Sequence, residues 1–374
     1  MFNSFRISPV HLPLICFCGR FRVSVTGGTK GWRAYCRPLL RMPAVPGRRA
    51  VSFSGHNFHR GIMHKYIRIM RLNHWIKNLF VLPGSAFALL LVPEATAQGY
   101  GSLFWNLFFG LLSTCLIASA NYVINEWLDA PFDRFHPVKK HRAVVEEGVD
   151  GRIVYALYAA LTLIGFALGL LVSLPVFLME LWLWVMGILY NVKPFRTKDL
   201  PFVDVLTESI NNAIRLLIGW FIITSVWYPP LSIIIGYWLG GAFLMDIKRF
   251  SEYRMIADKT TASLYRKSFA YYDERILLGA AFFYAMASSF FVGIFLIKYR
   301  IEFIVLMPFL MGLFCYYLMI SYKKDSAAQA PEKLYREKGL MLYVLFLSVL
   351  FVVLLKFDIP ALACFVSDRL IHIG

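Results

Sequence analysis

The sequence predicts an all-α, polytopic membrane protein built as one bundle of nine transmembrane helices. Of its 374 residues, 59% are hydrophobic and only 16% are charged, and the mean hydropathy is +0.60. A soluble domain of this length exposes far more polar surface. Several apolar stretches also approach or reach the roughly 20 residues that a helix needs to cross a bilayer. We therefore expect the lipid bilayer to surround most of the chain.

Nine apolar stretches are the candidate spans, and no long soluble segment separates them. The first contains Pro83 and Gly84, and the fourth is short, so these two are the least regular. This arrangement predicts a single transmembrane domain over residues 63–374. The nine stretches are 77–95, 103–124, 153–172, 174–190, 203–226, 230–247, 276–297, 301–321 and 339–357.

Basic residues mark every second connection between these spans. Lys and Arg are absent near 96–102, 173 and 227–229, and Lys298 with Arg300 is the one exception to the alternation. Cytoplasmic connections carry an excess of Lys and Arg. We therefore expect a central cavity that opens to the cytoplasmic side of a bacterial inner (plasma) membrane. The basic connections are 125–152, 191–199, 248–275 and 322–338.

Residues 1–62 differ from the rest of the chain, since they hold ten Lys and Arg and no acidic residue. An organelle transit peptide, a basic disordered arm, or a start codon assigned upstream of Met63 would each explain this composition. The segment also carries much of the net charge of +17 and leaves +7 for the other 312 residues. Because that remainder lies mostly between spans, we expect no nucleic-acid partner.

A first acidic array follows the second span, in the stretch NEWLDAPFDRFHPVKKHR. Asn125, Asp129 and Asp133 are spaced i, i+4, i+8 and would share one helical face, with Glu126 nearby. Pro131 predicts a kink or a short loop at the end of the array. Clustered carboxylates repel unless a cation neutralises them, and Mg²⁺ typically takes one or two carboxylates together with water and phosphate oxygens. The array predicts a Mg²⁺–diphosphate site, with a solvated loop as the alternative.

A second array lies inside the fifth span. Asp204, Glu208, Asn211 and Arg215 recur at i, i+4, i+7, i+11 and form one helical stripe. Ionisable groups in a membrane helix normally face the bundle interior or a wet cavity. The alternative is a structural salt bridge, for example between Glu208 and Arg215. Together the arrays predict one shared cavity in which Asp129, Asp133 and Asp204 are catalytic. The candidate metal ligands are Asn125, Glu126, Asp129, Asp133, Asp204 and Glu208.

Basic clusters on the same predicted side of the membrane are candidates for phosphate binding, because Lys and Arg are the usual phosphate ligands. They lie in RLNHWIKN, HPVKKHR, YNVKPFRTK, DIKRFSEYR and SLYRK. Topology signals alone would also place cations there. The candidate substrate-binding residues are Lys77, Asn125, Lys139, Lys140, Arg142, Tyr190, Lys193, Lys248, Arg249 and Arg266.

The paired arrays resemble those of the UbiA superfamily of intramembrane transferases, over residues 68–355. Within it the chain looks most like the decaprenyl-phosphate phosphoribosyltransferase branch. Those proteins open with R-x-x-x-W-x-K-N-x-L-V, here RLNHWIKNLFV, and their first acidic motif is N-D-x-x-D-x-x-x-D-R-x-H-P-x-K-R-x-R-P, here NEWLDAPFDRFHPVKKHRA. Shorter matches are KRFSE and PEKLYREKGL. The departures from the motifs are Phe80 for Leu, Glu126 for Asp, Lys140 for Arg, Ala143 for Pro, and Glu337 with Lys338 for Asp-Arg.

The resemblance implies a nine-span bundle whose two acidic motifs bind Mg²⁺ and a diphosphate. It further implies transfer of 5-phosphoribose from phosphoribosyl diphosphate to a polyprenyl phosphate, with release of pyrophosphate. The partners would then be a polyprenyl lipid and a phosphorylated sugar or diphosphate donor. The many cations favour this reaction, since three phosphate-bearing groups must be held. The alternatives are prenyl transfer to an aromatic or other small acceptor and, more remotely, an ion-coupled transporter.

Overall fold

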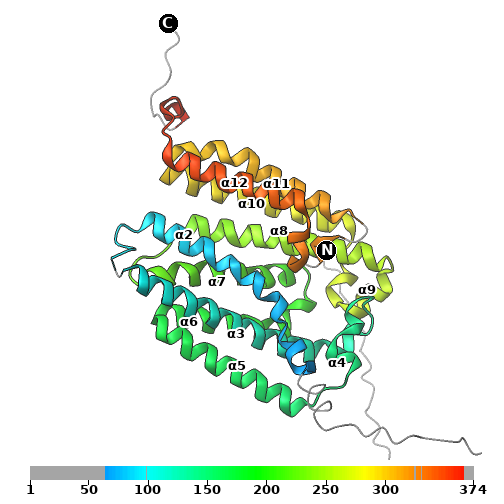
Figure 1. The fold of residues 1–374 in the computed structure, drawn as a ribbon. Helices are drawn as coiled ribbons and strands as arrows, with labels where there is room; N and C mark the ends of the chain where they lie inside the picture. The colour runs from blue at the N-terminus through cyan, green and yellow to red at the C-terminus, as the bar shows by residue number, and fades with distance from the viewer. Residues whose placement is uncertain (1–63, 98, 324–325, 330, 366–374) are drawn as a thin grey trace, which may run out of the picture. The chain divides into compact units, whose positions relative to one another are not determined.

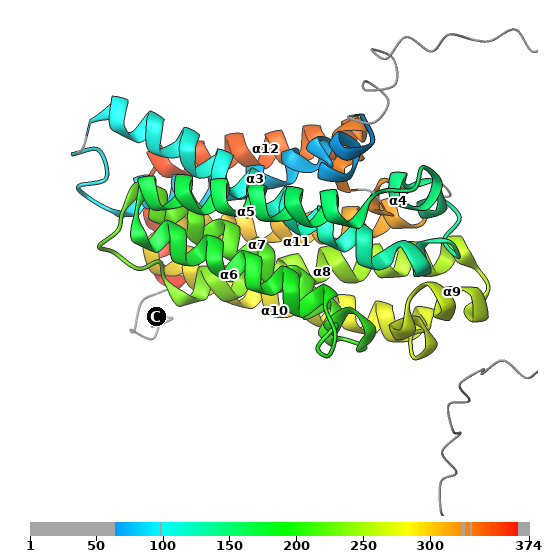
Figure 2. The same cartoon turned by 90° about the horizontal axis from the view of Figure 1, so that it is seen from below.

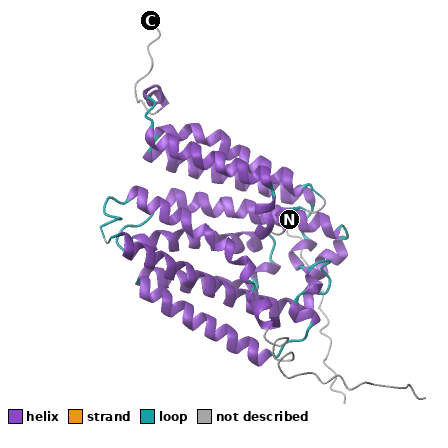
Figure 3. Cartoon of the chain, viewed as in Figure 1, coloured by secondary structure: helices purple, strands orange, loops and turns teal. Residues whose placement is uncertain are grey.

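The computed structural model describes residues 64–97, 99–323, 326–329 and 331–365 (Figure 1). The expectations for residues 1–62 lie outside this part of the chain. Within the described residues all regular structure is helical, which confirms the all-α prediction (Figure 3).

The helices follow the expected spans to within a few residues in most cases. The helices of the bundle, including the 3-10 helices η1 and η5 that lead directly into α2 and α11, are in chain order η1 (Leu72–Val81), α2 (Leu82–Leu91), α3 (Tyr100–Asp133), α5 (Gly151–Val172), α6 (Leu174–Asn191), α7 (Val203–Ile223), α8 (Leu231–Ile256), α10 (Glu274–Tyr299), η5 (Ile301–Leu306), α11 (Met307–Ser321) and α12 (Lys338–Lys356). The short helices of the connections and the C-terminal part are η2 (Lys139–His141), α4 (Ala143–Glu146), η3 (Thr197–Asp199), α9 (Lys259–Tyr265), η4 (Lys267–Ala270), η6 (Ala327–Gln329), η7 (Pro331–Arg336) and η8 (Pro360–Phe365).

Eight helices in the described part of the chain are long and apolar enough to cross a membrane, the first of them running over His64–Leu91. The chain is therefore an integral membrane protein. The expected count of nine is not confirmed, because α7 is not among the eight. The polar stripe with Asp204, Glu208 and Arg215 interrupts the apolar sequence of α7.

Pro131 does not form the short loop that was one of the two expectations for the end of the first acidic array. Helix α3 continues through Pro131 and ends at Asp133. Proline costs a helix one hydrogen bond and crowds the carbonyl four residues before it, and here only two residues of α3 follow Pro131. Asn125, Asp129 and Asp133 therefore share one continuous helix.

Helix α7 is the centre of the bundle and packs against α2, α3, α6 and α8 (Figures 1 and 2). Helix α5 covers α3 and α6 on one side, and α10 covers α8 on the other, with α11 and α12 beyond. Glycines allow the closest approach. A Cβ on Gly219 would lie 1.9 Å from the Val81 carbonyl oxygen, and one on Gly84 would lie 1.9 Å from the Leu216 carbonyl oxygen. Small residues at such crossings let membrane helices approach closely.

The connections that are rich in Lys and Arg gather at one end of the bundle, where α4 and α9 lie (Figures 1 and 2). We call this end the basic end. It comprises the connections 134–150, 192–202 and 257–273 and the described residues 322–323, 326–329 and 331–337. The acidic half of α7 begins there, because α7 starts directly after the connection 192–202. The fold thus places both acidic arrays next to the basic loops.

Candidate functional site

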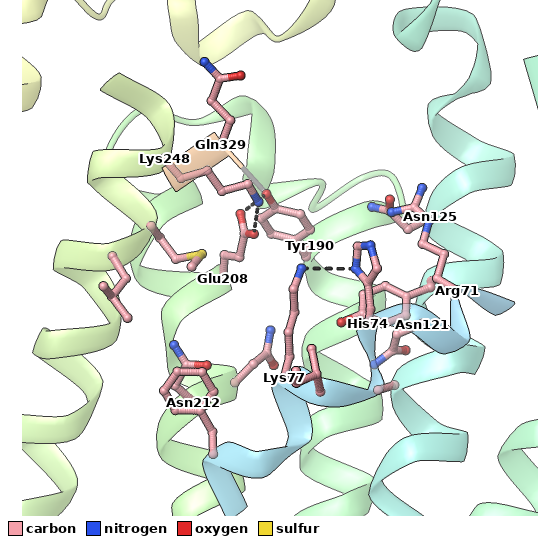
Figure 4. Close-up of a pocket in the computed structure, with 18 of the residues that line it drawn as sticks. Arg71, His74, Lys77, Asn121, Asn125, Tyr190, Glu208, Asn212, Lys248 and Gln329 are labelled. Carbon is pink, nitrogen blue, oxygen red and sulfur yellow. Dashed lines mark hydrogen bonds and ion pairs between the residues drawn. The ribbon is translucent and has the colours of Figure 1, made fainter. Parts of the chain in front are cut away.

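A cavity of about 420 Å³ lies between η1, α3, α6, α7 and α8 and reaches the loops of the basic end. Both acidic arrays contribute to its wall, since Asn125 and Asp129 come from α3 and Glu208 comes from α7. Figure 4 shows Glu208 beside Lys248 and Tyr190 on one side, with Asn125 on the other. Asn125, Asp129 and Glu208 from the two arrays thus line one cavity, and their roles in it stay a prediction.

Asp129 is held by two cations from the connection 192–202. Its Oδ1 accepts from Arg196 Nη2 at 3.0 Å and from Lys198 Nζ. Lys198 is buried and also donates to Asn191 Oδ1 at 2.8 Å. Burial lowers the pKa of Lys198 to about 8, although the neighbouring Asp129 acts to raise it. The carboxylate is therefore already neutralised in the protein without a metal.

The other two acids of the first array are buried and do not line the cavity. Asp133 accepts from Arg142 Nη1 at 2.5 Å. Glu126 accepts from Arg71 Nε at 2.9 Å and from Arg71 Nη2 at 2.6 Å. Arg71 and Arg142 do line the cavity. These acids thus orient cations toward the cavity, and Glu126 joins the opening motif to the acidic motif.

Asp204 is fully buried and likewise does not line the cavity. Its Oδ2 accepts from Arg249 Nε at 3.1 Å, Arg266 Nη1 at 3.3 Å and Ser268 Oγ at 3.3 Å, and its Oδ1 accepts from Tyr272 Oη at 2.6 Å. Four donors from two different segments converge on one carboxylate. Asp204 therefore ties α7 to α8 and to the connection 257–273.

Glu208 is the acid of the second array that faces the cavity. It accepts from Lys248 Nζ at 2.9 Å, from Tyr190 Oη at 2.8 Å and from Arg249. The structural alternative of a Glu208–Arg215 salt bridge is not what the structure shows, because Glu208 pairs with the two cations of α8. Arg215 lies further along the same stripe and has other partners.

Seven of the ten candidate substrate-binding residues line the cavity, and three do not. Lys140 and Lys193 are exposed to solvent outside it. Arg249 is fully buried and pairs with Asp204, Glu208 and Glu252. The seven that line it are Lys77, Asn125, Lys139, Arg142, Tyr190, Lys248 and Arg266.

The residues that sequence reasoning missed lie close to those that it chose. Helix α6 ends at Asn191, and the left-handed backbone of Arg196 (φ 31°) turns the following loop back toward α3. As a result Arg196 and Lys198, rather than Lys193, contact Asp129. All three belong to the stretch YNVKPFRTK, but nothing in its spacing indicates which cation turns inward.

His136 orders the loop that carries Lys139. Its Nδ1 accepts from the backbone N–H groups of Val138 and Lys139, both at 3.1 Å. Burial, with a further contribution from Lys139, lowers the pKa of His136 to about 3, so the ring is neutral at physiological pH. Lys139 Nζ then reaches Glu252 Oε1 at 2.7 Å. His136 is thus a positioning group for this loop.

The donor set fits a divalent cation that arrives together with a diphosphate. No group of three or more His, Cys, Asp or Glu side chains suited to a metal occurs within the described ranges. Magnesium commonly binds through one or two carboxylates and takes its remaining ligands from water and substrate phosphate. Asp129 and Glu208 on the cavity wall, with the amide oxygen of Asn125, meet that requirement. A preformed protein cage is not needed.

The sequence profile of the UbiA prenyltransferase family matches residues 81–350. The chain belongs to the UbiA prenyltransferase family. Its helical fold agrees with a UbiA homolog from Archaeoglobus fulgidus bound to GPP and Mg²⁺, with a TM-score of 0.59 and 20% identity over 78% of this chain and 99% of that one. A second structure of that homolog, bound to DMAPP and Mg²⁺, gives a TM-score of 0.58 at 19% identity, over 78% of this chain and 100% of that one. The UbiA-type fold that the motifs implied is thereby confirmed.

The curated relatives include decaprenyl-phosphate phosphoribosyltransferases. The protein of that name from Mycolicibacterium smegmatis is 26% identical over 226 residues, which are 58% of this chain and 65% of that protein. The one from Corynebacterium glutamicum is 26% identical over 231 residues, 60% of this chain and 63% of that protein. The nodulation protein NoeC of Azorhizobium caulinodans is 24% identical over 218 residues, 57% of this chain and 65% of that protein. The chain thus spans less than two thirds of these relatives, and it lies near the branch that its motifs indicated.

Proposed function

We propose that this UbiA family member is a Mg²⁺-dependent membrane transferase that moves 5-phosphoribose from phosphoribosyl diphosphate to a polyprenyl phosphate, releasing pyrophosphate. One observation carries the proposal. A single cavity presents a carboxylate from each acidic array, Asp129 and Glu208, and surrounds them with Lys and Arg side chains from five segments. Such a surface suits substrates that carry several phosphate groups. The relatives named decaprenyl-phosphate phosphoribosyltransferase support the same choice.

In the proposed reaction an oxygen of the lipid phosphate bonds to C1 of the ribose while the bond from C1 to the diphosphate oxygen breaks. The leaving pyrophosphate keeps the electron pair. The lipid phosphate is already an anion, so no general base is required. Bound Mg²⁺ would supply neutralisation of the negative charge that builds on the pyrophosphate. Asp129, Asn125 and Glu208 would hold this metal-bound diphosphate, and Lys139, Arg142 and Arg266 would hold phosphates.

Asp133 and Asp204 enter the proposal in a different way. Each is buried against a guanidinium, Asp133 against Arg142 and Asp204 against Arg249 and Arg266. Their part in the site would be to aim these cations, and they would become metal ligands only if the guanidinium groups turned to the substrate phosphates. The same holds for Glu126 and Arg71. We place the basic end on the cytoplasmic side of a bacterial inner membrane, by the excess of Lys and Arg in its loops.

The deciding experiment incubates purified protein with Mg²⁺, radiolabelled phosphoribosyl diphosphate and polyprenyl phosphate, and measures label in the organic phase. We expect metal-dependent label with the wild-type chain. Asp129→Asn should abolish it while the protein stays folded in detergent, and near-normal turnover of this variant would remove the proposed metal role of Asp129.

Prenyl transfer is the second candidate, because the structural neighbours from Archaeoglobus fulgidus were solved with the prenyl diphosphates GPP and DMAPP. No label in the organic phase, from protein shown to be folded, would favour it. The next assay would then supply a prenyl diphosphate and a panel of aromatic acceptors. Membership in the UbiA prenyltransferase family argues against the transporter alternative.

A further inference from the structure

Arg215 differs from the other arginines on the cavity wall. It lies on α7 and lines the cavity, yet only 8% of its surface is exposed. Its Nε donates to Asn78 Oδ1 at 2.9 Å, and its Nη1 donates to the Asn211 carbonyl oxygen at 3.1 Å. Both acceptors are neutral, and no ion pair joins Arg215 to a carboxylate of the described residues. By contrast, Arg71, Arg142 and Arg266 each pair with an acid.

Burying a positively charged arginine inside a membrane helix without a negative partner is unfavourable in free energy. A charged side chain inside a membrane helix is retained where it faces an aqueous cavity or meets an opposite charge. The fully buried carboxyl of Glu180 on α6 interacts with Arg215 electrostatically but forms no ion pair or hydrogen bond with it, and its Oε1 accepts from Thr114 Oγ1 of α3 at 2.7 Å. The counter-charge of Arg215 is therefore expected from a ligand in the cavity.

Arg215 lies further along α7 than Glu208, the acid of this helix that faces the cavity. It follows Glu208 by seven residues on α7, which corresponds to about 10 Å along a helix. The hydrogen bond to the Asn211 carbonyl shows that the guanidinium reaches back one turn toward Glu208. Lys77, whose neighbour Asn78 bonds Arg215, also lines the cavity, and Figure 4 shows its ammonium group beside His74. The cavity thus has a second positive region whose central cation, Arg215, has no carboxylate partner.

We propose that Arg215, with Lys77, binds a phosphate monoester at a subsite distinct from the carboxylates that face the diphosphate. A guanidinium presents paired N–H groups that match phosphate oxygens, and it does so without a metal. This inference rests on the proposed function, in which two substrates carry such a group: the acceptor lipid phosphate and the 5-phosphate of the donor. The apolar side chains of Phe80, Leu244 and Met245 also line the cavity and favour the lipid phosphate.

The test measures binding separately from turnover. Thermal unfolding of the detergent-solubilised protein is followed with polyprenyl phosphate, with the uncharged polyprenol, and with ribose 5-phosphate. We compare wild type, Arg215→Met, Arg215→Lys, and Arg275→Met as a matched control outside the cavity, where the arginine is exposed. Arg215→Met should weaken binding of the phosphate ligand about tenfold to a hundredfold. Arg215→Lys should retain part of it, and the control should equal wild type.

The probe whose binding is weakened by Arg215→Met identifies which substrate carries the phosphate that Arg215 binds. Loss of polyprenyl phosphate binding alone assigns the acceptor, and loss of ribose 5-phosphate binding alone assigns the donor. The proposal is overturned if neither probe stabilises the wild type, or if Arg215→Met lowers the unliganded unfolding temperature and leaves both affinities unchanged. If wild type binds polyprenyl phosphate through Arg215 but transfers no phosphoribose, the proposed function fails and the subsite stands.

Discussion

Arg249 Nε lies 3.1 Å from Asp204 Oδ2, and both side chains are completely buried. The same guanidinium also pairs with Glu208 and, at 3.3 Å, with Glu252. One cation thus contacts three carboxylates from α7 and α8, and each of these acids has a second cationic partner, which is Arg266, Lys248 or Lys139. Removing a single partner from such a buried arrangement leaves the others as uncompensated charges.

Arg249→Met is expected to destabilise the protein by about 3–5 kcal/mol, since three carboxylates in or beside the buried network would each lose one of their cationic partners. Lys248→Met is the matched control, because Lys248 is the next residue and pairs only with Glu208, at the cavity wall. Thermal unfolding in detergent should show a much larger decrease for Arg249→Met. Equal decreases would show that Arg249 is not the centre of this network.

Lys198 and Asp129 provide a second prediction, because the ammonium group occupies the carboxylate oxygen that a metal would use. Lys198→Met should therefore raise the affinity of the substrate-free protein for Mn²⁺, a spectroscopic substitute for Mg²⁺, by about tenfold. The same change should weaken binding of phosphoribosyl diphosphate, since one positive charge next to Asp129 on the cavity wall is lost. Mn²⁺ titration followed by electron paramagnetic resonance measures the first effect, and donor binding by calorimetry measures the second.

Lys193→Met is the control for this experiment, because Lys193 lies in the same loop but is exposed. It should change neither affinity. A lower Mn²⁺ affinity in Lys198→Met would contradict the assignment of Asp129 as a ligand that competes with Lys198.

The span positions were predictable because hydrophobic length and charged boundaries are local properties. Helix α5, for example, runs over Gly151–Val172 where 153–172 was expected. The continuation of α3 past Pro131 was not predictable from propensity, since the cost of proline depends on its place in the helix. Helix α7 was expected as a span over 203–226, but its polar stripe keeps it out of the eight helices that are long and apolar enough to cross a membrane.

The candidate site was predictable as a set of segments but not as a set of contacts. Asn125, Asp129 and Glu208 line one cavity, whereas Asp133 and Asp204 from the same two arrays are buried and do not line it. The partners of Asp204 were beyond sequence reasoning, because Arg266 and Tyr272 come from a loop more than 60 residues away. Such long-range pairings depend on how the helices pack, and no local pattern encodes them.

The crossing of α7 with η1 and α2 gives the last prediction. A Cβ at Gly219 would lie 1.9 Å from the Val81 carbonyl oxygen, and a backbone atom cannot move aside as a flexible side chain can. Gly219→Ala should therefore push the two segments apart and cost roughly 1–3 kcal/mol or more. Because η1 carries Lys77 and Asn78 and α7 carries Arg215, the shift should also weaken substrate binding. Gly279→Ala on α10 is the control, since a Cβ there meets nothing within 4 Å. Thermal unfolding should show a clear loss for Gly219→Ala and none for Gly279→Ala, and equal melting of the two variants would contradict the close contact.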